Sequence, residues 1–499
     1  MPDTLNETPA LSGGADAPVV MTDLGAVRGV SLGGGAAAFR DIPFAAPPVG
    51  PLRWREAQPA AAWSGTLDAS RFGFACPQAV SPGAPPVPQG EDCLTLNIVT
   101  PDVGGTGLPV LFSIHGGAFF VGSGRYIADK DLSPIVRRGV VLVSANYRLG
   151  RFGFLAHPAL TAEAGRGTGN FWLSDEIAAL RWVQRNIARF GGDPANVTIL
   201  GCSAGGSSVN ALLTTEVAHG LFAAAACHSG GGLFNAARPL ARAQAEGIAF
   251  ARRCGIAPDD PAVLEKLRAL TVEEILAGDP GPPDFGAIID GHLITRPIAV
   301  SFAEGRRAPV PLIVGSTGNE ASIFGMMGFD AATLRARFGI DLGEVRGVYE
   351  EDGPLSDAEL LRRVQTDFLF TSASLGLASF AARSAPTWAY HFDYVPAARR
   401  GGKPGASHCA DMPYIFADDA RRSADDVAVA ERQQRYWYNF IATGDPNGPG
   451  LPDWPCVAPG RPAVLMTDDT SGIATAPHAR RMAYWHGRWS GETGVAMLP

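Results

Sequence analysis

The chain has 499 residues, 46% of them hydrophobic and 18% charged, which is typical of a globular protein that can bury a large core. Its formal net charge of −8 disfavours nucleic acid and anionic membrane surfaces as partners. The sequence contains no basic cluster and no apolar run of about 18 residues, so a membrane-spanning helix is not expected.

The first 20 residues are polar and include prolines, without the basic and apolar segments of a secretory signal. We therefore expect residues 1–19 to form a polar tail and the protein to remain in the cytoplasm, unless a signal was removed. The cysteines are odd in number and form no C-x-x-C pair, so no zinc site or other metal site is predicted. They are Cys76, Cys93, Cys202, Cys227, Cys254, Cys409 and Cys456.

Residues 110–114 form an apolar run that predicts a buried strand, followed by the loop His115-Gly116-Gly117-Ala118-Phe119. A glycine-rich loop after a strand leaves backbone N–H groups free to point at a ligand. Such donors stabilise the negative charge that develops on a carbonyl oxygen during acyl transfer, and one donor is typically worth about 10²–10³ in rate. We expect Gly116 and Gly117 to contribute to an oxyanion hole and His115 to hold the loop in place.

A helix is predicted between Ser174 and Phe190, because apolar residues recur there at steps of three and four. The resulting apolar face comprises Ile177, Leu180, Val183, Ile187 and Phe190. Ser174 is the expected N-cap, with Asp175 and Glu176 in the first turn, and Gly191 is expected to end the helix. This helix is interpreted as scaffold that packs on a sheet.

The pentapeptide Gly201-Cys202-Ser203-Ala204-Gly205 follows the β-type run 196–200 and precedes a segment of small residues. In that context it predicts a nucleophile elbow, a sharp strand-to-helix turn that needs glycines where the chain passes close to itself. Ser203 would be the nucleophile and the N–H of Ala204 a further oxyanion donor. A G-x-S-x-G pattern alone is weak in a chain with 61 glycines, where an ordinary glycine-rich turn is the alternative.

Several ordered motifs together resemble the type-B carboxylesterases, a family that includes cholinesterases and bacterial para-nitrobenzyl esterases. The resemblance covers most of the chain. Its motifs are Arg-Asp-Ile-Pro-Phe-Ala-Ala-Pro-Pro-Val-Gly at 40–50, Glu-Asp-Cys-Leu-Thr-Leu-Asn-Ile at 91–98, Asn-Tyr-Arg-Leu-Gly at 146–150, Phe-Gly-Gly-Asp-Pro at 190–194 and Thr-Gly-Asp-Pro-Asn at 443–447.

The same resemblance implies the two remaining catalytic groups. Glu320 follows the short apolar strand predicted at 311–315, where the family keeps its acid, and His408 lies in a loop similar to the family's histidine loop. The order of Ser203, Glu320 and His408 is that of α/β-hydrolases. His408 would take the proton of Ser203 during attack on the ester, and Glu320 would hold the imidazole in the required tautomer.

Other polar residues near these motifs have alternative roles. His391, within the strand predicted at 388–394, is interpreted as a structural histidine, Asp411 as a solvated or capping carboxylate, and Asp290 as a carboxylate that ties down a loop. Cys409 is interpreted as a small packed residue.

Two cysteine positions bear on the resemblance. Cys202 stands where relatives usually carry glutamate or glutamine, which leaves the triad whole and puts substrate preference in doubt. Cys76 and Cys93 resemble a pair that is bridged in secreted relatives, and whether they are bridged here stays open.

The resemblance implies the α/β-hydrolase fold, with a large, mostly parallel mixed sheet flanked by helices. Because the candidate catalytic groups extend from residue 116 to residue 408, we expect one catalytic domain over residues 20–499. Cap-like segments are expected at about 230–310 and 320–385. The chain is expected to be a monomer or a small homo-oligomer without a cofactor.

The expected reaction is hydrolysis of small, uncharged esters, short-chain or aryl, through an acyl-enzyme. Apolar side chains that could line the substrate pocket are Trp172, Phe285, Phe324, Met327 and Phe368, although core packing is the alternative for each. Other open possibilities are a lipase, a carbamate, thioester or amide hydrolase, and an inactive cholinesterase-like module for binding or adhesion.

Overall fold

The computed structural model describes residues 17–79, 87–128, 132–234, 237–279, 285–325, 328–351, 353–402, 404–419, 422–458, 462–468 and 471–496. Most of the predicted polar tail and the candidate pocket residue Met327 therefore lie outside the described residues.

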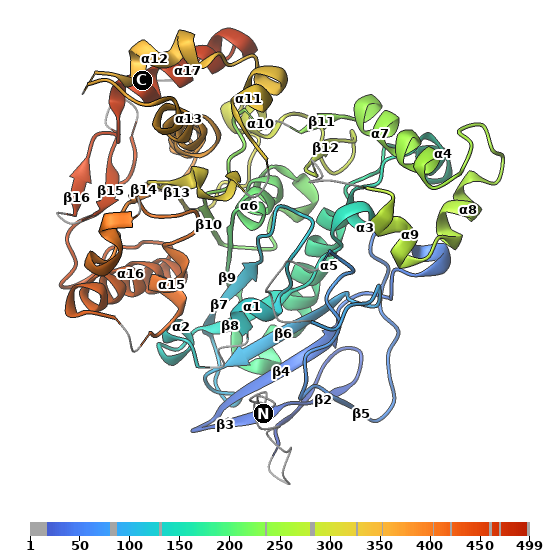
Figure 1. Cartoon of the computed structure of the whole chain (residues 1–499). Helices are drawn as coiled ribbons and strands as arrows, with labels where there is room; N and C mark the ends of the chain where they lie inside the picture. Colours follow the sequence, from blue (N-terminus) through green and yellow to red (C-terminus); the bar gives the residue numbers. More distant parts are fainter. Residues whose placement is uncertain are drawn as a thin grey trace, which may run out of the picture.

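A large twisted sheet forms the centre of the molecule (Figure 1). In the described chain it has 11 strands in the order β16-β15-β14-β13-β10-β9-β7-β8-β6-β4-β3, parallel from β8 to β15 and antiparallel at both edges. This confirms the predicted α/β class with a mostly parallel mixed sheet. The strands are β3 (Val30–Gly33), β4 (Ala36–Pro43), β6 (Thr95–Thr100), β7 (Leu108–Ile114), β8 (Val141–Ala145), β9 (Gly192–Cys202), β10 (Ala224–His228), β13 (Leu312–Thr317), β14 (Thr387–Phe392), β15 (Val464–Thr467) and β16 (Gly472–Ala474).

Two smaller sheets lie outside the central one. The first comprises β1 (Val19–Met21), β2 (Ala26–Arg28) and β5 (Thr66–Asp68), and the second β11 (Arg238–Pro239) and β12 (Ile288–Ile289).

Helices cover both faces of the central sheet because successive strand residues point to opposite sides. On β7, Phe112 packs into the core that contains α5 and α6, whereas Leu111 packs into the core that contains α2, α15 and α16. The helices of these two cores include α2 (Pro134–Arg137), α5 (Phe171–Asn186), α6 (Ala204–Thr214), α10 (Ile298–Ala303), α14 (Ser372–Ala381), α15 (Met412–Phe416) and α16 (Ala424–Thr443).

Two further groups of helices lie on either side of the carboxyl end of β9 (Figure 1). One group has a hydrophobic core of its own, built around Leu334, Phe368 and Trp485, and comprises α11 (Ala331–Phe338), α12 (Leu342–Tyr349), α13 (Asp357–Thr366) and α17 (Ala479–Thr493). The other comprises α3 (Gly150–Phe154), α4 (Pro158–Ala164), α7 (Leu240–Arg253), α8 (Val263–Ala269) and α9 (Val272–Ala277), while α1 (Arg125–Ala128) lies against β8. None of the helices in the described ranges has the length and apolarity needed to cross a bilayer.

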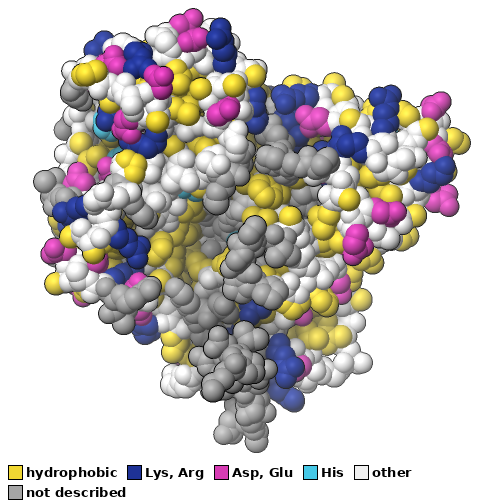
Figure 2. Space-filling model, viewed as in Figure 1, with side chains coloured by type: hydrophobic (Ala, Val, Ile, Leu, Met, Phe, Trp, Pro, Cys, Tyr) yellow, Lys and Arg dark blue, Asp and Glu magenta, His cyan; other side chains and the backbone are white. Residues whose placement is uncertain are grey.

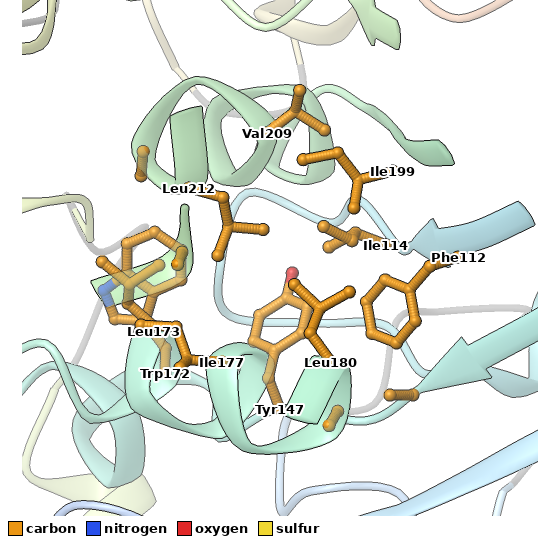
Figure 3. Close-up of a cluster of buried hydrophobic side chains, with 14 of the residues drawn as sticks. Phe112, Ile114, Tyr147, Trp172, Leu173, Ile177, Leu180, Ile199, Val209 and Leu212 are labelled. Carbon is orange, nitrogen blue, oxygen red and sulfur yellow. The ribbon is translucent and has the colours of Figure 1, made fainter. Parts of the chain in front are cut away.

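The predicted scaffold helix is α5 together with the 3₁₀ turn Ile187–Phe190. Its predicted apolar face is buried, and Leu180 points into the core that it shares with Phe112 and Ile114 of the sheet (Figure 3). As predicted, Gly191 ends it, in a left-handed conformation with φ 89°.

The predicted start of this helix was wrong. The helix begins at Phe171, with Asn170 as N-cap, and Ser174 Oγ instead bonds to the carbonyl of Phe171. Asp175 is buried in an ion pair with Arg148 (2.7 Å), so this carboxylate contributes to tertiary packing rather than to an exposed first turn.

Candidate active site

Ser203 occupies a sharp turn between strand β9, which ends at Cys202, and helix α6, which begins at Ala204. Its backbone is in an unusual conformation, with φ 61° and ψ −123°, and such strain persists only where the surrounding structure enforces it. A Cβ on Gly201 would overlap the backbone of Gly205, so only glycine fits. The turn has the strand-to-helix geometry expected of a nucleophile elbow.

Glu320 lies just after β13, where its fully buried carboxylate bonds to Nδ1 of His408. The other carboxylate oxygen, Oε1, accepts hydrogen bonds from the Thr317 amide (2.6 Å) and the Ser229 hydroxyl (2.7 Å). These three partners fix the carboxylate, and an ionised carboxylate only accepts hydrogen bonds. Nδ1 of His408 therefore carries the proton, which leaves Nε2 as the basic nitrogen.

The ring of His408 is fixed by its neighbours, but its Nε2 makes no hydrogen bond to a described residue. The side chain is 6% exposed, its backbone amide donates to Ser322 Oγ (2.9 Å), and its ring lies 5.1 Å from the ring of Phe370. Within the described part of the chain, the buried Nε2 has no hydrogen-bond partner. It is therefore available to accept a proton.

A disulfide between Cys202 and Cys409 brings the serine and histidine segments together. The two Cα atoms are 6.2 Å apart although 207 positions separate them in the sequence. The interpretation of Cys409 as a small packed residue was therefore wrong, because the sheet brings it to the end of β9. Cys76 and Cys93, the pair left open, are both buried free thiols in this structure.

The loop after β7 lies next to the elbow. A Cβ built on Gly116 would be 3.3 Å from Cβ of Ser203. Gly117 has φ 111°, and a Cβ there would overlap the carbonyl of Val121. Among the described residues, no hydrogen bond uses the amide N–H of Gly116 or Gly117, and Ala204 starts a helix, where N–H groups lack an intrahelical partner.

His115 anchors this loop. Its Nδ1 bonds to the carbonyl of Gly116 (2.9 Å), and its ring stacks on Tyr147 with centroids 4.3 Å apart. The Tyr147 hydroxyl donates to the carbonyl of His115 (2.8 Å). Burial lowers the pKa of His115 to about 4, so the ring is neutral at pH 7. These contacts agree with the predicted structural role.

A buried polar cluster beneath the elbow was not predicted. Oδ2 of Asp411 lies 2.6 Å from His228 Nδ1 and 2.7 Å from the Tyr390 hydroxyl, and the Trp437 indole N–H donates to His228 Nε2 (2.9 Å). Asp411 is fully buried and makes no side-chain cap bond, so its interpretation as a solvated or capping carboxylate was wrong. The cluster is connected to the turn at Ser203, because the carbonyl of His228 accepts the Ser203 amide (3.0 Å).

The other two alternatives were interpreted correctly. His391 is buried, its Nδ1 lies 3.2 Å from Ser316 Oγ, and burial lowers its pKa to about 4. Asp290 holds a loop, since its Oδ1 accepts hydrogen bonds from the amides of His292 and Ile294.

A cavity of about 550 Å³ lies beside the first turns of α6, and Figure 2 shows hydrophobic side chains on the walls of the central hollow. Two predicted pocket residues, Trp172 and Phe285, line this cavity. Sequence reasoning missed the other aromatic walls, Phe119, Phe234 and Phe338, and three basic ones, Arg238, Arg242 and Arg337. These residues come from separate segments, and nothing in their local sequence marks them.

The remaining candidates, Phe324 and Phe368, lie in the aromatic cluster next to this cavity rather than in its described wall. Phe368 contacts two wall residues, with ring centroids 4.3 Å from Phe234 and 5.0 Å from Phe338. It therefore supports the wall from behind.

A second cavity of about 250 Å³ lies beside the loop after β7. Its walls include Gly116, Cys202, Tyr126, Met412 and Phe416. The described residues contain no group of three or more His, Cys, Asp or Glu side chains placed to hold a metal ion.

Comparisons with known proteins agree with this geometry. The sequence model described as "Carboxylesterase family" matches residues 16–345 and 348–485. The chain is 35% identical to fumonisin B1 esterase of Sphingopyxis macrogoltabida, covering 87% of this chain and 83% of that protein. It is also 35% identical to phenmedipham hydrolase of Pseudarthrobacter oxydans, covering 93% and 97%. The solved structure of a PNB esterase matches with a TM-score of 0.81 at 31% identity, covering 94% of this chain and 99% of that one, and the fold is that of the α/β-hydrolases.

Proposed function

Because the chain belongs to the carboxylesterase family and is a carboxylic-ester hydrolase, we propose that it works through an acyl-enzyme formed on Ser203. The observation that carries the proposal is the pair of Glu320 and His408, whose Nε2 is left without a partner in the described chain. The disulfide next to both residues links the segment of this base to Cys202, the last residue of the strand before Ser203.

Acylation begins when Ser203 Oγ attacks the ester carbonyl and transfers its proton to His408 Nε2. Glu320 stabilises the imidazolium that forms and keeps the proton on Nδ1. The amides of Gly116, Gly117 and Ala204 donate to the oxyanion, and each such donor is worth about 10²–10³ in rate. His408 then protonates the departing alcohol, which leaves the acyl group on Ser203.

Deacylation repeats these steps with water as the nucleophile. His408 Nε2 removes a proton from a water molecule as it attacks the acyl carbonyl, and the same amides stabilise the second oxyanion. Return of the proton to Ser203 Oγ releases the acid.

The proposed substrates are small, uncharged esters with a short-chain or aryl group. Aromatic rings dominate one part of the cavity wall, including Phe119 and Trp172, whose ring centroids are 5.0 Å apart, and Phe285. Apolar walls favour an uncharged group that loses its water on binding.

A second candidate substrate class is an ester with a carboxylate remote from the scissile bond. Arg238, Arg242 and Arg337 lie in the wall of the same cavity, and its described wall contains no acidic side chain. Glu246 bonds to both Arg238 and Arg242, while Arg337 lies over the rings of Phe329 and Phe338. Guanidinium groups in the described wall favour a substrate with a negative substituent.

The organisation of the protein is proposed on the same basis. Residues 20–499 act as one catalytic domain in which the segments at about 230–310 and 320–385 serve as a cap. The aromatic and basic cavity residues Phe234, Arg238, Phe285 and Arg337 come from these segments, which supports a role in substrate selection. We propose a monomer or small homo-oligomer in the cytoplasm.

The test compares Ser203→Ala with the exposed control Ser31→Ala on a series of para-nitrophenyl esters of increasing acyl length. Ser203→Ala should remove turnover without unfolding the protein, and Ser31→Ala should leave it unchanged. Substantial hydrolysis by folded Ser203→Ala would exclude the acyl-enzyme on Ser203. Turnover of the para-nitrophenyl monoester of glutaric acid, which carries a remote carboxylate, is compared with turnover of para-nitrophenyl pentanoate, which is uncharged. The ester that is hydrolysed faster identifies the preferred substrate class.

A further inference from the structure

The Cys202–Cys409 disulfide joins the two residues that are immediate neighbours of the proposed nucleophile and the proposed base. Cys202 is the last residue of β9 and precedes Ser203, while Cys409 follows His408. A crosslink at these positions fixes the distance between the two catalytic segments, whatever else stabilises each segment.

Other contacts of the histidine segment lead to different strands. The carbonyl of Ala406 accepts the Asn319 amide (2.8 Å), the His408 amide donates to Ser322 (2.9 Å), and Asp411 bonds to His228 at the end of β10. The first two contacts secure the base to the segment that carries Glu320. The disulfide instead secures it to the end of β9, immediately before Ser203.

The backbone at Cys409 shows that this position is held under constraint. Its φ is 57°, in the left-handed region, which is unfavourable for a non-glycine residue. The backbone strain at Cys409 must therefore be offset by other interactions, and the bond to Cys202 is one of them.

The disulfide can also be reached by a small thiol. Cys202 lines the cavity of about 250 Å³ beside the oxyanion loop, and Cys409 is only partly buried. Thiol–disulfide exchange requires access of a thiolate to one of the sulfurs. In a reducing compartment such a bond is exposed to reduction.

From these observations we propose that the Cys202–Cys409 disulfide is a positioning crosslink that keeps His408 within reach of Ser203, and that its reduction lowers turnover. The inference rests on the proposed roles of Ser203 and His408. In the reduced protein the base stays bonded to Glu320, and the Asp411–His228 contact still ties the histidine segment to the Ser203 turn, but the covalent link between the two segments is lost.

The chemistry of the switch is a two-electron exchange with a dithiol such as dithiothreitol. One thiolate of the dithiol attacks a sulfur of the disulfide, forms a mixed disulfide and releases the other cysteine as a thiolate. The second thiol of the reagent then displaces the remaining cysteine and closes an oxidised ring. Two protons from the dithiol end on the two cysteines, and oxidation reverses the exchange.

A thiol count tests whether the bond exists. All seven cysteines lie in described residues, and five of them are free thiols in the structure. Protein unfolded without reductant should therefore titrate five thiols with Ellman's reagent, and seven after reduction and removal of the dithiol. Seven thiols before reduction would overturn the proposal.

Kinetics test whether the bond positions the base. Since a displacement of about 1 Å can cost about 100-fold in rate, dithiothreitol should lower kcat about tenfold to 100-fold. KM should change less than twofold, because the described wall of the 550 Å³ cavity contains neither Cys202 nor Cys409. Cys202→Ser, Cys409→Ser and the double variant should each show the same loss, because any one of them removes the whole crosslink. Additive losses, or an unchanged or higher kcat after reduction, would refute the positioning role.

Two further variants separate positioning from folding. Cys409→Gly removes the crosslink and also the backbone strain, so it should lose kcat as Cys409→Ser does while remaining more stable to heat. Cys456→Ser, at an exposed free thiol, should keep full activity and its response to reductant.

The proposed function is tested separately by the oxidised protein. If a fluorophosphonate fails to label Ser203 while five thiols are counted, the nucleophile assignment fails and the crosslink stands without a catalytic role. If the fluorophosphonate labels Ser203 equally fast before and after reduction of the disulfide, the positioning role of the disulfide is overturned. The assignment of Ser203 as the nucleophile then still stands.

Discussion

Substitution of Asp411 tests the buried cluster beneath the turn at Ser203. The Trp437 indole can only donate, so the nitrogen of His228 that it contacts, Nε2, carries no proton. His228 therefore donates from Nδ1 to Asp411, and the Tyr390 hydroxyl donates to the same carboxylate oxygen. Burial opposes ionisation of Asp411, but the hydrogen bonds from His228 and Tyr390 hold the pKa of this carboxyl below its usual value.

Asp411→Ala removes the acceptor of both His228 Nδ1 and the Tyr390 hydroxyl. Because Nδ1 also lies 2.7 Å from the Tyr390 oxygen, His228 can donate there, and one buried donor, the Tyr390 hydroxyl, is left without an acceptor. An unsatisfied buried donor costs about 1–3 kcal/mol, so the free energy of unfolding should fall by about that amount. Asp411→Asn keeps an acceptor oxygen of similar size and should cost less. Turnover should also fall in the alanine variant, because the Ser203 amide bonds to the carbonyl of His228.

Urea unfolding followed by fluorescence, with para-nitrophenyl acetate turnover measured in parallel, provides the assay. Asp453→Ala, at an exposed aspartate, is the matched control and should stay within about 0.5 kcal/mol of the original protein. An Asp411→Ala variant that matches this control would refute the assigned hydrogen bonds.

Two other predictions concern the acid and a buried histidine. Glu320→Gln should lower kcat by about 10⁴-fold with little change in KM, because an amide no longer fixes the imidazole tautomer or stabilises the imidazolium, and a loss below tenfold would exclude this role. Burial lowers the pKa of His391 to about 4, so the unfolded chain binds a proton at this site between pH 7 and pH 5 while the folded protein does not. Stability should therefore fall on acidification, with His391 contributing about 2 kcal/mol of the loss. In urea titrations, the free energy of unfolding of His391→Gln should therefore fall by about 2 kcal/mol less than that of the original protein between pH 7 and pH 5. If the two proteins show the same dependence on pH, the calculation is contradicted.

Local patterns predicted the features that depend on a few neighbouring residues. The apolar run at 110–114 and the β-type run at 196–200 became β7 and β9, because β-branched and other apolar residues suit strands that are buried in a parallel sheet. The strand-to-helix turn at Ser203 could be predicted from its flanking glycines, because a side chain at Gly201 would overlap the nearby backbone of Gly205. Glu320 and His408, which bond to each other, were found only through the family resemblance.

Features that depend on long-range contacts escaped prediction. Cys202 and Cys409 are far apart in the sequence, and only the order of strands in the sheet places them together. Asp411 looked like a surface carboxylate because its partners, His228 and Tyr390, lie on other strands. The start of α5 was missed because Asp175, expected in an exposed first turn, pairs with the buried Arg148.

Fluorophosphonate labelling followed by peptide mass spectrometry tests the central claim most directly, since the reagent reacts only with an activated serine. The proposed mechanism predicts one adduct per chain, located on Ser203, and much slower labelling in His408→Ala. A folded protein that remains unlabelled, or that carries its adduct on a different serine, would contradict the mechanism and favour the inactive binding module.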